Sequence, residues 1–316
     1  MGSKFVHSVF GPVPSRRLGR SLGIDTVPMK TCNWNCVYCQ LGRSKPMVKE
    51  RKSWIPSDSI VEEVHNAIRT RGGTFDWITF VGSGEDTLHS EIGSIAQQVK
   101  AISPVPVAFI TNGSTLYLDD VRNGLAALDA VMPTLDAGNE KLYLRMARPV
   151  KEASFKRHME GLLAFSKMKR TAKLNIEVML VSELNDTEEE LESLAGRMEE
   201  IQPDAIHLML PTRCPTETWV KVPSDEALIR AQAILGAKAS LMASSELTLS
   251  LAASENLKQD VTDIVTRHPL RMDDLIRALP FPTEEASFTF LETLAAHQSI
   301  MIVERLGIPF VKGMPS

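Results

Sequence analysis

The feature that most constrains this 316-residue chain is a short loop holding three of its four cysteines. Cys32, Cys36 and Cys39 fall within eight residues, in the spacing C-x3-C-x2-C. Cysteine thiolates hold iron-sulfur clusters, and a cubane cluster normally takes four of them. Three cysteines leave one iron open to a ligand other than protein, as in metal sites that carry out chemistry rather than hold a fold together.

Grouped cysteines also suit two other kinds of site. The loop could hold a zinc ion, with Cys214 or a histidine as the fourth ligand, because cysteine clusters in reducing compartments are often zinc sites. A disulfide framework fits poorly, because four cysteines are too few to staple 316 residues. We expect Cys214 to take no part in the site, because a fourth thiolate would close the cluster.

The loop resembles that of the radical S-adenosylmethionine superfamily, in which an aromatic residue, here Tyr38, precedes the third cysteine. The resemblance implies one 4Fe-4S cluster held by Cys32, Cys36 and Cys39. Its free iron would be chelated by the amino and carboxylate groups of S-adenosylmethionine, and Tyr38 would lie beside this cofactor. One electron from the cluster would then cleave the sulfonium and release a 5′-deoxyadenosyl radical, which abstracts hydrogen from a substrate.

Residues 11–23 and 135–138 look like an uncharacterised branch of these enzymes near the wyosine-forming tRNA synthases. Members of that branch can end in a winged helix. The synthases themselves need a second cluster, and the only cysteine outside the loop is Cys214. A tRNA-modifying activity is therefore an alternative that the sequence disfavours.

Positive charge is concentrated around the cysteine loop. Residues 1–52 hold ten Lys or Arg against two acidic residues, so this segment carries +8 and the other 264 residues carry −12. Such a field draws in anions. We expect a small-molecule or nucleotide-like anionic substrate and an acidic electron donor, flavodoxin or ferredoxin. Arginines near the strand ends can clamp a carboxylate or phosphate, and the candidates are Arg16, Arg17, Arg148 and Arg213.

The chain shows no run of eighteen apolar residues, and its first twenty residues are basic without an apolar core. These features predict neither a membrane span nor a secretory signal. We therefore expect a cytoplasmic location, whose reducing conditions also suit an oxygen-sensitive cluster.

Strands and helices alternate from residue 22 to residue 235. The pattern predicts strands over 22–27, 77–81, 105–111, 130–135, 174–181 and 206–210, and helices from residue 57 and over 89–102, 118–128, 154–168, 187–201 and 224–235. Six such units indicate a parallel α/β sheet, either a partly closed barrel or an open sheet. The resemblance implies a partial (β/α)6 barrel. Both architectures bind ligands beyond the carboxyl ends of the strands, where the cysteine loop falls.

Other strand ends carry candidate cofactor residues. The second strand is followed by Gly82, Ser83, Gly84 and Glu85, which are similar to the glycine-glycine-glutamate motif that binds the amino group of S-adenosylmethionine in the superfamily. Asn112 and Asp136 follow the next two strands. They could bind the methionyl or ribose part of the cofactor, or satisfy local backbone groups.

The fifth and sixth strands alternate between branched apolar residues and other side chains. If the branched face packs on helices, then Glu177, Met179, His207 and Met209 look into the barrel and shape a cofactor or substrate cavity. The methionines could equally fill the core, and His207 could be a satisfied core histidine.

The last residues predict a second, smaller domain. We expect a barrel over 1–235, a connector over 236–256 with one possible strand at 246–251, and a winged-helix-like domain over 257–316. The third predicted helix, over 283–297, carries Glu284, Glu285 and Glu292 with no Lys or Arg. An acidic helix is repelled by phosphates, so DNA binding is not expected. An iron-sulfur sensor coupled to this domain is the alternative function.

Overall fold

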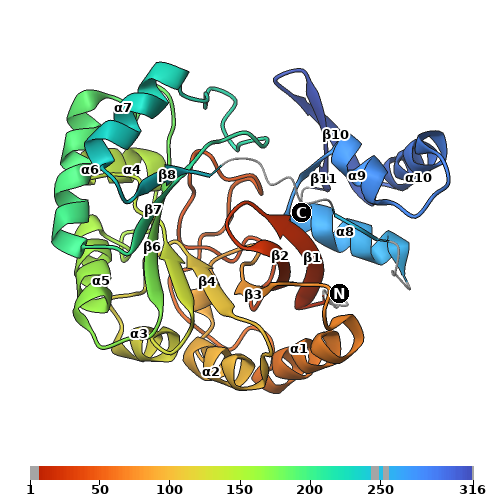
Figure 1. Ribbon diagram of the computed structural model, residues 1–316, viewed down its shortest axis with the longest axis horizontal. Coiled ribbons are helices and arrows are strands. Elements are labelled where there is room, and N and C mark those ends of the chain that lie inside the picture. The colour runs from red at the N-terminus through yellow and green to blue at the C-terminus, as the bar shows by residue number, and fades with distance from the viewer. Residues whose placement is uncertain (1–6, 243–248, 252–255, 315–316) are drawn as a thin grey trace.

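One eight-stranded sheet organises the computed structural model, which describes residues 7–242, 249–251 and 256–314 (Figure 1). Its strands lie side by side in chain order. They are β1 Val9–Ser15, β2 Gly19–Ile24, β3 Trp77–Phe80, β4 Val107–Thr111, β5 Ala130–Pro133, β6 Lys173–Met179, β7 Ala205–Met209 and β8 Ala239–Leu241. Strand β1 is antiparallel to β2, and all later neighbours are parallel.

This strand order decides between the two predicted architectures. An open doubly wound sheet reverses its order at a switch point, whereas this sheet grows in one direction from β1 to β8. Because β8 does not pair with β1, the curved sheet stays a partial barrel. Seven helices alternate with its strands and lie on its outer face (Figure 1). They are α1 Ser57–Arg71, α2 Ile92–Ile102, α3 Asp119–Leu125, α4 Glu140–Ala147, α5 Phe155–Lys167, α6 Glu188–Ile201 and α7 Asp225–Leu235.

The six predicted strand-helix units are confirmed, but two strands of the main sheet and one of its α-helices were missed. Strand β1 contains Pro12 and Pro14, which made its segment look like turns; prolines are tolerated there because β1 is the sheet's edge strand. Helix α4 has only eight residues and is capped by Asn139, whose side chain accepts a hydrogen bond from the Leu142 N–H. Strand β8 lies within the predicted connector. Of the strand predicted at 246–251, residues 246–248 lie outside the described residues.

The two faces of the sheet differ as the alternation predicted. Branched residues such as Leu174, Ile176 and Val178 on β6 are buried in the main core with the helices. The opposite face holds polar groups, among them Glu177 and a hydrogen bond of 2.6 Å between the hydroxyls of Ser21 and Thr79. The face of the sheet turned away from the helices is therefore the polar one.

The C-terminal residues form three helices and a three-stranded antiparallel sheet that pack against β1. These are α8 Leu257–Arg267, β9 Leu270–Arg271, α9 Met272–Ala278, α10 Glu284–Ala296, β10 Ile300–Arg305 and β11 Ile308–Gly313. Their core includes Phe10 and Val13 from β1 together with Val261, Leu275 and Val311. We call residues 256–314 the tail. The predicted helices and hairpin are present, whereas the winged-helix assignment and the domain boundaries stay predictions.

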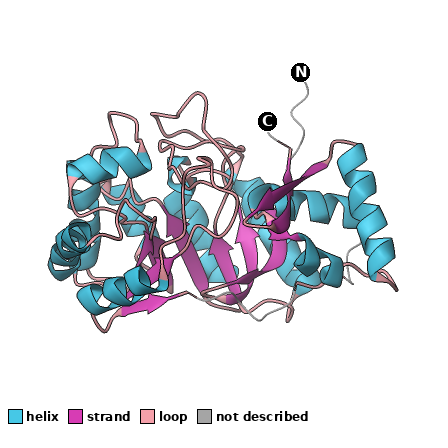
Figure 2. Cartoon of the chain, turned by 90° about the horizontal axis from the view of Figure 1, so that it is seen from above, coloured by secondary structure: helices cyan, strands magenta, loops and turns pink. Residues whose placement is uncertain are grey.

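The tail stands beside the β1 edge, and long loops gather over one end of the strands (Figure 2). The loop after β2, with its three cysteines, belongs to this end. None of the helices described is both long enough and apolar enough to cross a membrane.

Candidate active site

The cysteine loop is anchored by the apolar residues between its thiols. Trp34 and Val37 are buried, and the Trp34 ring packs edge-on against Tyr143 with centroids 5.3 Å apart. Backbone N–H groups of Asn35 and Val37 donate to carbonyls of Ala147 and Met146 at the end of α4, both at 2.9 Å. The loop is thus held against α4, the helix that the sequence did not predict, while the three cysteines remain half-buried.

The glycine loop, residues 82–85 after β3, is joined to the cysteine loop by backbone hydrogen bonds. The Lys30 N–H donates to the Ser83 carbonyl at 2.7 Å, and the Glu85 N–H donates to the Thr31 carbonyl at 2.9 Å. A Cβ added to Gly84 would come within 2.2 Å of the Thr31 oxygen, and one added to Gly82 within 2.3 Å of Asp25 Oδ1. Both glycines therefore allow close contacts within the chain itself.

Glu85 lies buried between these loops with both carboxylate oxygens occupied. Oε1 accepts from the Thr87 N–H at 3.1 Å and from the hydroxyls of Thr87 and Thr111, at 2.5 and 2.6 Å, and Oε2 accepts from the Asn112 N–H at 2.6 Å. Burial nevertheless raises the pKa of the Glu85 carboxyl. These contacts make Glu85 a residue that orders the site. A direct bond to the cofactor's amino group stays a prediction.

Asn112 reaches the cysteine loop. Its Nδ2 donates to Asn33 Oδ1 at 2.9 Å and lies 3.9 Å from Cys32 Sγ, while Asn33 in turn donates to Ser114 Oγ at 2.8 Å. The loops after β2, β3 and β4 are therefore joined in one hydrogen-bond network that runs beside Cys32.

Asp136 holds the aromatic residue of the cysteine motif. The Tyr38 hydroxyl donates to Asp136 Oδ2, and the Met179 N–H donates to Asp136 Oδ1 at 2.7 Å. Burial raises the pKa of Asp136 to about 7. Tyr38, Asp136 and Met179, three separate candidates for cofactor binding, are thus brought together. Their predicted contacts with the cofactor are not tested by this geometry.

Inside the barrel, Arg17 meets the polar residues of β6 and β7. Its Nε lies 2.8 Å from Glu177 Oε1, and its Nη1 lies 3.4 Å from Met209 Sδ. Burial, and then the charge of Arg17, lower the pKa of His207 to about 4, so this imidazole is neutral near pH 7. Arg148 is not brought to this group, because its guanidinium binds Glu217 Oε1 at 2.6 Å.

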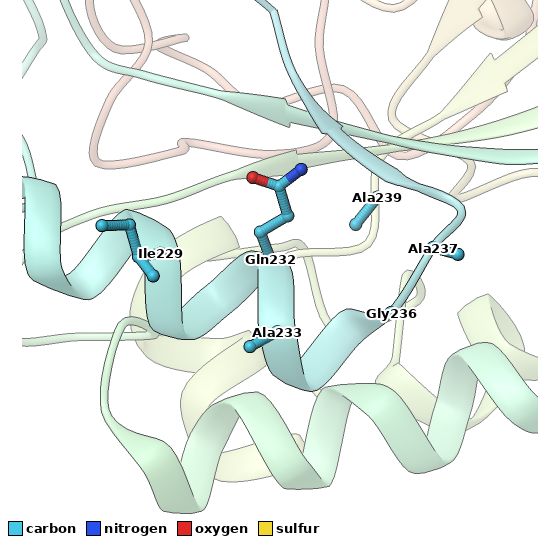
Figure 3. A pocket seen from close by; sticks show the side chains of 6 residues that line it. All are labelled: Ile229, Gln232, Ala233, Gly236, Ala237 and Ala239. Atoms are coloured by element: carbon cyan, nitrogen blue, oxygen red, sulfur yellow. The ribbon is translucent and has the colours of Figure 1, made fainter.

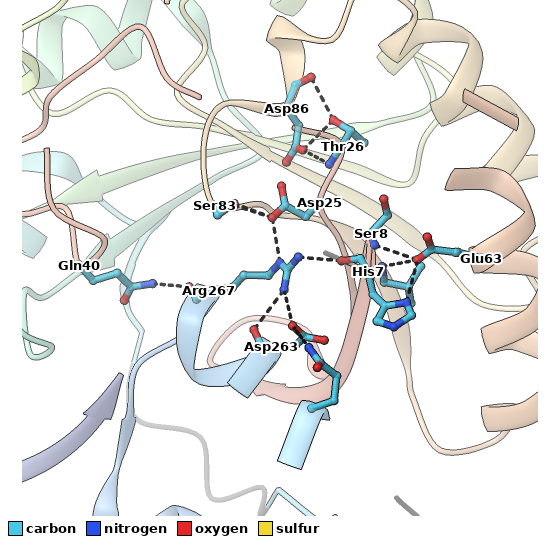
Figure 4. Close-up of polar contacts among 12 residues, drawn as sticks. His7, Ser8, Asp25, Thr26, Gln40, Glu63, Ser83, Asp86, Asp263 and Arg267 are labelled. Carbon is cyan, nitrogen blue, oxygen red and sulfur yellow. Dashed lines mark hydrogen bonds and ion pairs between the residues drawn. The ribbon is translucent and has the colours of Figure 1, made fainter. Parts of the chain in front are cut away.

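Arg267 of the tail reaches under the glycine loop, a contact that sequence reasoning missed (Figure 4). Its Nε lies 2.9 Å from Asp25 Oδ2, and that oxygen also accepts from the Ser83 N–H and hydroxyl, at 3.1 and 2.7 Å. Nothing in the local pattern distinguishes Arg267 from a surface residue at the end of an amphipathic helix. Asp25 could have been suspected, because it is the polar residue directly after β2.

Two hollows lie outside the cysteine and glycine loops. One, of about 440 Å³, lies between the end of α7 and β8 and has no charged side chain in its lining (Figure 3). The other, of about 400 Å³, lies between α1, β1 and α8, and includes His7, Glu63 and Asp263. Neither contains a cysteine or a glycine-loop residue, so neither is the candidate active site.

The cysteines fit a cluster better than the alternative metal sites. All four cysteines are free thiols, so there is no disulfide framework. No three His, Cys, Asp or Glu side chains in the described part of the chain converge on a position for a single ion, as a mononuclear zinc site needs. Burial raises the pKa of Cys32 to about 12 and also raises those of Cys36 and Cys39. Because these pKa values are raised, the three thiols lose their protons near pH 7 only when positively charged metal lies beside them. A cluster of several irons would supply that charge.

Comparison with known proteins agrees with this geometry. The family model of the radical SAM superfamily matches residues 26–195. A UPF0026 protein of Methanocaldococcus jannaschii is 33% identical over 276 residues, 85% of each chain. A protein of Brachyspira hyodysenteriae named GTPase Obg is 34% identical over 280 residues, but the chain spans only 41% of that protein's length.

Solved structures share the fold. A radical SAM methyltransferase from Sphaerobacter thermophilus matches with a TM-score of 0.53 and 17% identity, covering 70% of this chain and 66% of that one. Streptococcus suis SuiB bound to S-adenosylmethionine matches with a TM-score of 0.51 and 16% identity, covering 74% and 53%. The predicted place near the wyosine-forming synthases stays a prediction.

A family match over more than half of the sequence, carried by the cysteine loop and the barrel around it, identifies this chain as a member of the radical SAM superfamily, whose enzymes use a 4Fe-4S cluster and S-adenosylmethionine.

Proposed function

We propose that this enzyme cleaves S-adenosylmethionine reductively and removes a hydrogen atom from an anionic substrate bound in the mouth of the barrel. The observation that carries the proposal is the hydrogen-bond network that joins the cysteine loop, the glycine loop and the end of β4. It connects Cys32, Ser83, Glu85 and Asn112 at the end of the barrel where ligands bind.

The chain's own residues have separable tasks in this proposal. Cys32, Cys36 and Cys39 would hold the cluster and leave one iron for the cofactor. The glycine loop would bind the cofactor's methionyl part, and Glu85 would hold this loop in place through its hydrogen bonds to Thr87, Thr111 and Asn112. When bound and reduced, the cluster would supply the one electron that breaks the cofactor's C5′–S bond, which would leave methionine and a radical able to take a hydrogen atom from the substrate.

The polar barrel interior would orient the substrate. Arg17, whose Nε lies 2.8 Å from Glu177 Oε1, and neutral His207 offer a guanidinium donor and a hydrogen-bonding ring within the same space. Because these groups are largely desolvated, their interactions with a bound anion are stronger than on the surface. Enclosure also keeps water away from a reactive radical.

The basic surface around the cysteine loop would receive the electron donor. Arg43, Lys45, Lys49 and Lys52 are exposed near the three cysteines in sequence. Flavodoxin and ferredoxin are acidic, and complementary charge speeds the encounter of two proteins. Electron transfer from such a donor should slow as salt is raised.

The test is anaerobic reconstitution with iron and sulfide, followed by dithionite, S-adenosylmethionine and an assay for 5′-deoxyadenosine. The unchanged protein should form the nucleoside, and Cys36→Ala should not. Cys214→Ala is the matched control, because this cysteine lies outside the loop, and it should behave as the unchanged protein. No nucleoside from a fully iron-loaded protein would contradict the proposal.

A further inference from the structure

A second group of arginines lies where the barrel meets the tail, and its hydrogen-bond partners carry no charge. One partner is the imidazole of His268, which is neutral because burial, and then the charge of Arg213, lower its pKa well below the usual value. From the barrel, Arg16 Nη2 donates to Thr212 Oγ1 at 2.7 Å, and Arg213 Nη1 donates to Gln40 Oε1 at 3.1 Å. From the tail, His268 faces the same guanidinium, with Arg213 Nη2 2.5 Å from His268 Nε2. Four separate segments therefore converge here.

Among the described residues, no acidic side chain pairs with this group. Within the described ranges of the chain, no carboxylate lies within 4.0 Å of the guanidinium nitrogens of Arg16, Arg213 or Arg271. Neighbouring Arg17 differs, because Glu177 lies 2.8 Å from it. Arg16 and Arg213 are half-buried, and half-buried arginines without an anion are unusual, since removing charge from water is costly unless it is paired.

Electrostatics show that these charges act on one another. Burial lowers the pKa of Arg213 to about 9, and the charges of Arg16 and Arg17 contribute. Burial also lowers the pKa of Arg16, and so do the charges of Arg17 and Arg271. A bound anion would relieve this repulsion.

The group lies beside the cluster loop, because Gln40, which Arg213 binds, directly follows Cys39. The tail's side of the group is held firmly in place. Arg267, which precedes His268, is buried against Asp25, and its own carbonyl accepts from Gln40 Nε2 at 3.2 Å. An anion here would be fixed next to the reacting centre by barrel and tail together.

We infer that Arg16 and Arg213 of the barrel, with His268 and Arg271 of the tail, form a binding site for the phosphate group of a small-molecule substrate. The inference rests on the proposed function for the identity of the anion as substrate. A carboxylate is matched by one guanidinium fork, whereas a phosphate dianion offers three oxygens and the charge that several arginines need. A nucleic acid fits less well, because the exposed α10 of the tail carries Glu284 and Glu285 in its first turn.

The experiment measures binding of inorganic phosphate by calorimetry to the reconstituted full chain at low salt. Arg213→Gln should weaken binding about 10- to 100-fold, because a charge-assisted hydrogen bond is lost. Arg271→Gln should weaken it about 2- to 5-fold through its field alone. Arg20→Gln is the matched control: Arg20 is exposed and already paired with Asp76 at 2.8 Å, so phosphate affinity should not change.

Acetate should bind at least about 10-fold more weakly than the phosphate dianion, because it has two oxygens and one negative charge fewer. Three results would overturn the inference: no phosphate binding, equal weakening by Arg20→Gln and Arg213→Gln, or tighter binding of single-stranded RNA than of phosphate. Should Arg213→Gln fail to fold, Arg271→Gln decides, because its side chain is exposed. Nucleoside formation without phosphate binding contradicts this inference alone, whereas phosphate binding without nucleoside contradicts only the proposed function.

Discussion

Replacing Arg267 by methionine should destabilise the protein by about 3 to 5 kcal/mol, because it leaves a buried carboxylate without its partner. The Arg267 and Asp25 side chains are only 3% and 2% exposed, and their charged atoms lie 2.9 Å apart. Arg267 also donates to the carbonyl of His7 at 2.7 Å and lies over the Phe10 ring. Methionine keeps much of the apolar packing, so the loss should come from the charge.

The measurement is urea denaturation followed by circular dichroism under anaerobic, reducing conditions. Arg277→Met is the matched control in the same tail. Its ion pair with Asp274 is about half exposed and should contribute under about 0.5 kcal/mol. The double variant Asp25→Asn with Arg267→Met should recover part of the stability, because the unpaired charge is gone.

The same change should weaken S-adenosylmethionine binding, because Asp25 also holds the Ser83 N–H and hydroxyl of the glycine loop. The reasoning is refuted if Arg267→Met costs under about 1 kcal/mol, since an uncompensated buried charge cannot be so cheap. It is also refuted if Arg277→Met costs as much.

Further predictions concern the same end of the barrel. Gly84→Ala should cost about 1 to 3 kcal/mol and lower iron content, because its Cβ would lie 2.2 Å from the Thr31 backbone, whereas Gly196→Ala meets nothing within 4 Å and should be neutral or stabilising. Glu85→Gln should raise the Kd for S-adenosylmethionine at least about 10-fold, since the amide nitrogen that replaces one carboxylate oxygen cannot accept the hydrogen bonds made to that oxygen; an unchanged Kd by calorimetry would contradict this. The depressed pKa of His207 means that the unfolded chain binds a proton the folded chain does not, so stability should fall as pH drops from 6.5 to about 4. Denaturation curves for His207→Gln should show a smaller loss, and an equal loss would show that this histidine is not responsible.

The sequence was informative where function depends on spacing within one segment. The cysteine loop, the glycine loop and the polar alternation around Glu177 are all local patterns, and each lies on the side of the sheet that the pattern indicated. Strand β1 was hidden because Pro12 and Pro14 are compatible with a strand only at a sheet edge, and no local pattern identifies an edge.

Contacts between distant segments could not be predicted. Arg267 and Asp25 are 242 residues apart, and the pair exists only because the tail packs against β1. Gly82 and Gly84, expected from the motif to bind the cofactor, allow close approach to Asp25 and Thr31 of the chain itself. A glycine motif predicts that another group lies very close to the backbone, but only the folded structure shows which group that is.

The most direct test is the electron paramagnetic resonance spectrum of the dithionite-reduced, reconstituted protein with and without S-adenosylmethionine. A cluster held by Cys32, Cys36 and Cys39 has one iron that the cofactor can occupy, so its signal should shift when the cofactor is added. A spectrum that is identical in both samples, or a protein that binds zinc and forms no cluster, would contradict the account.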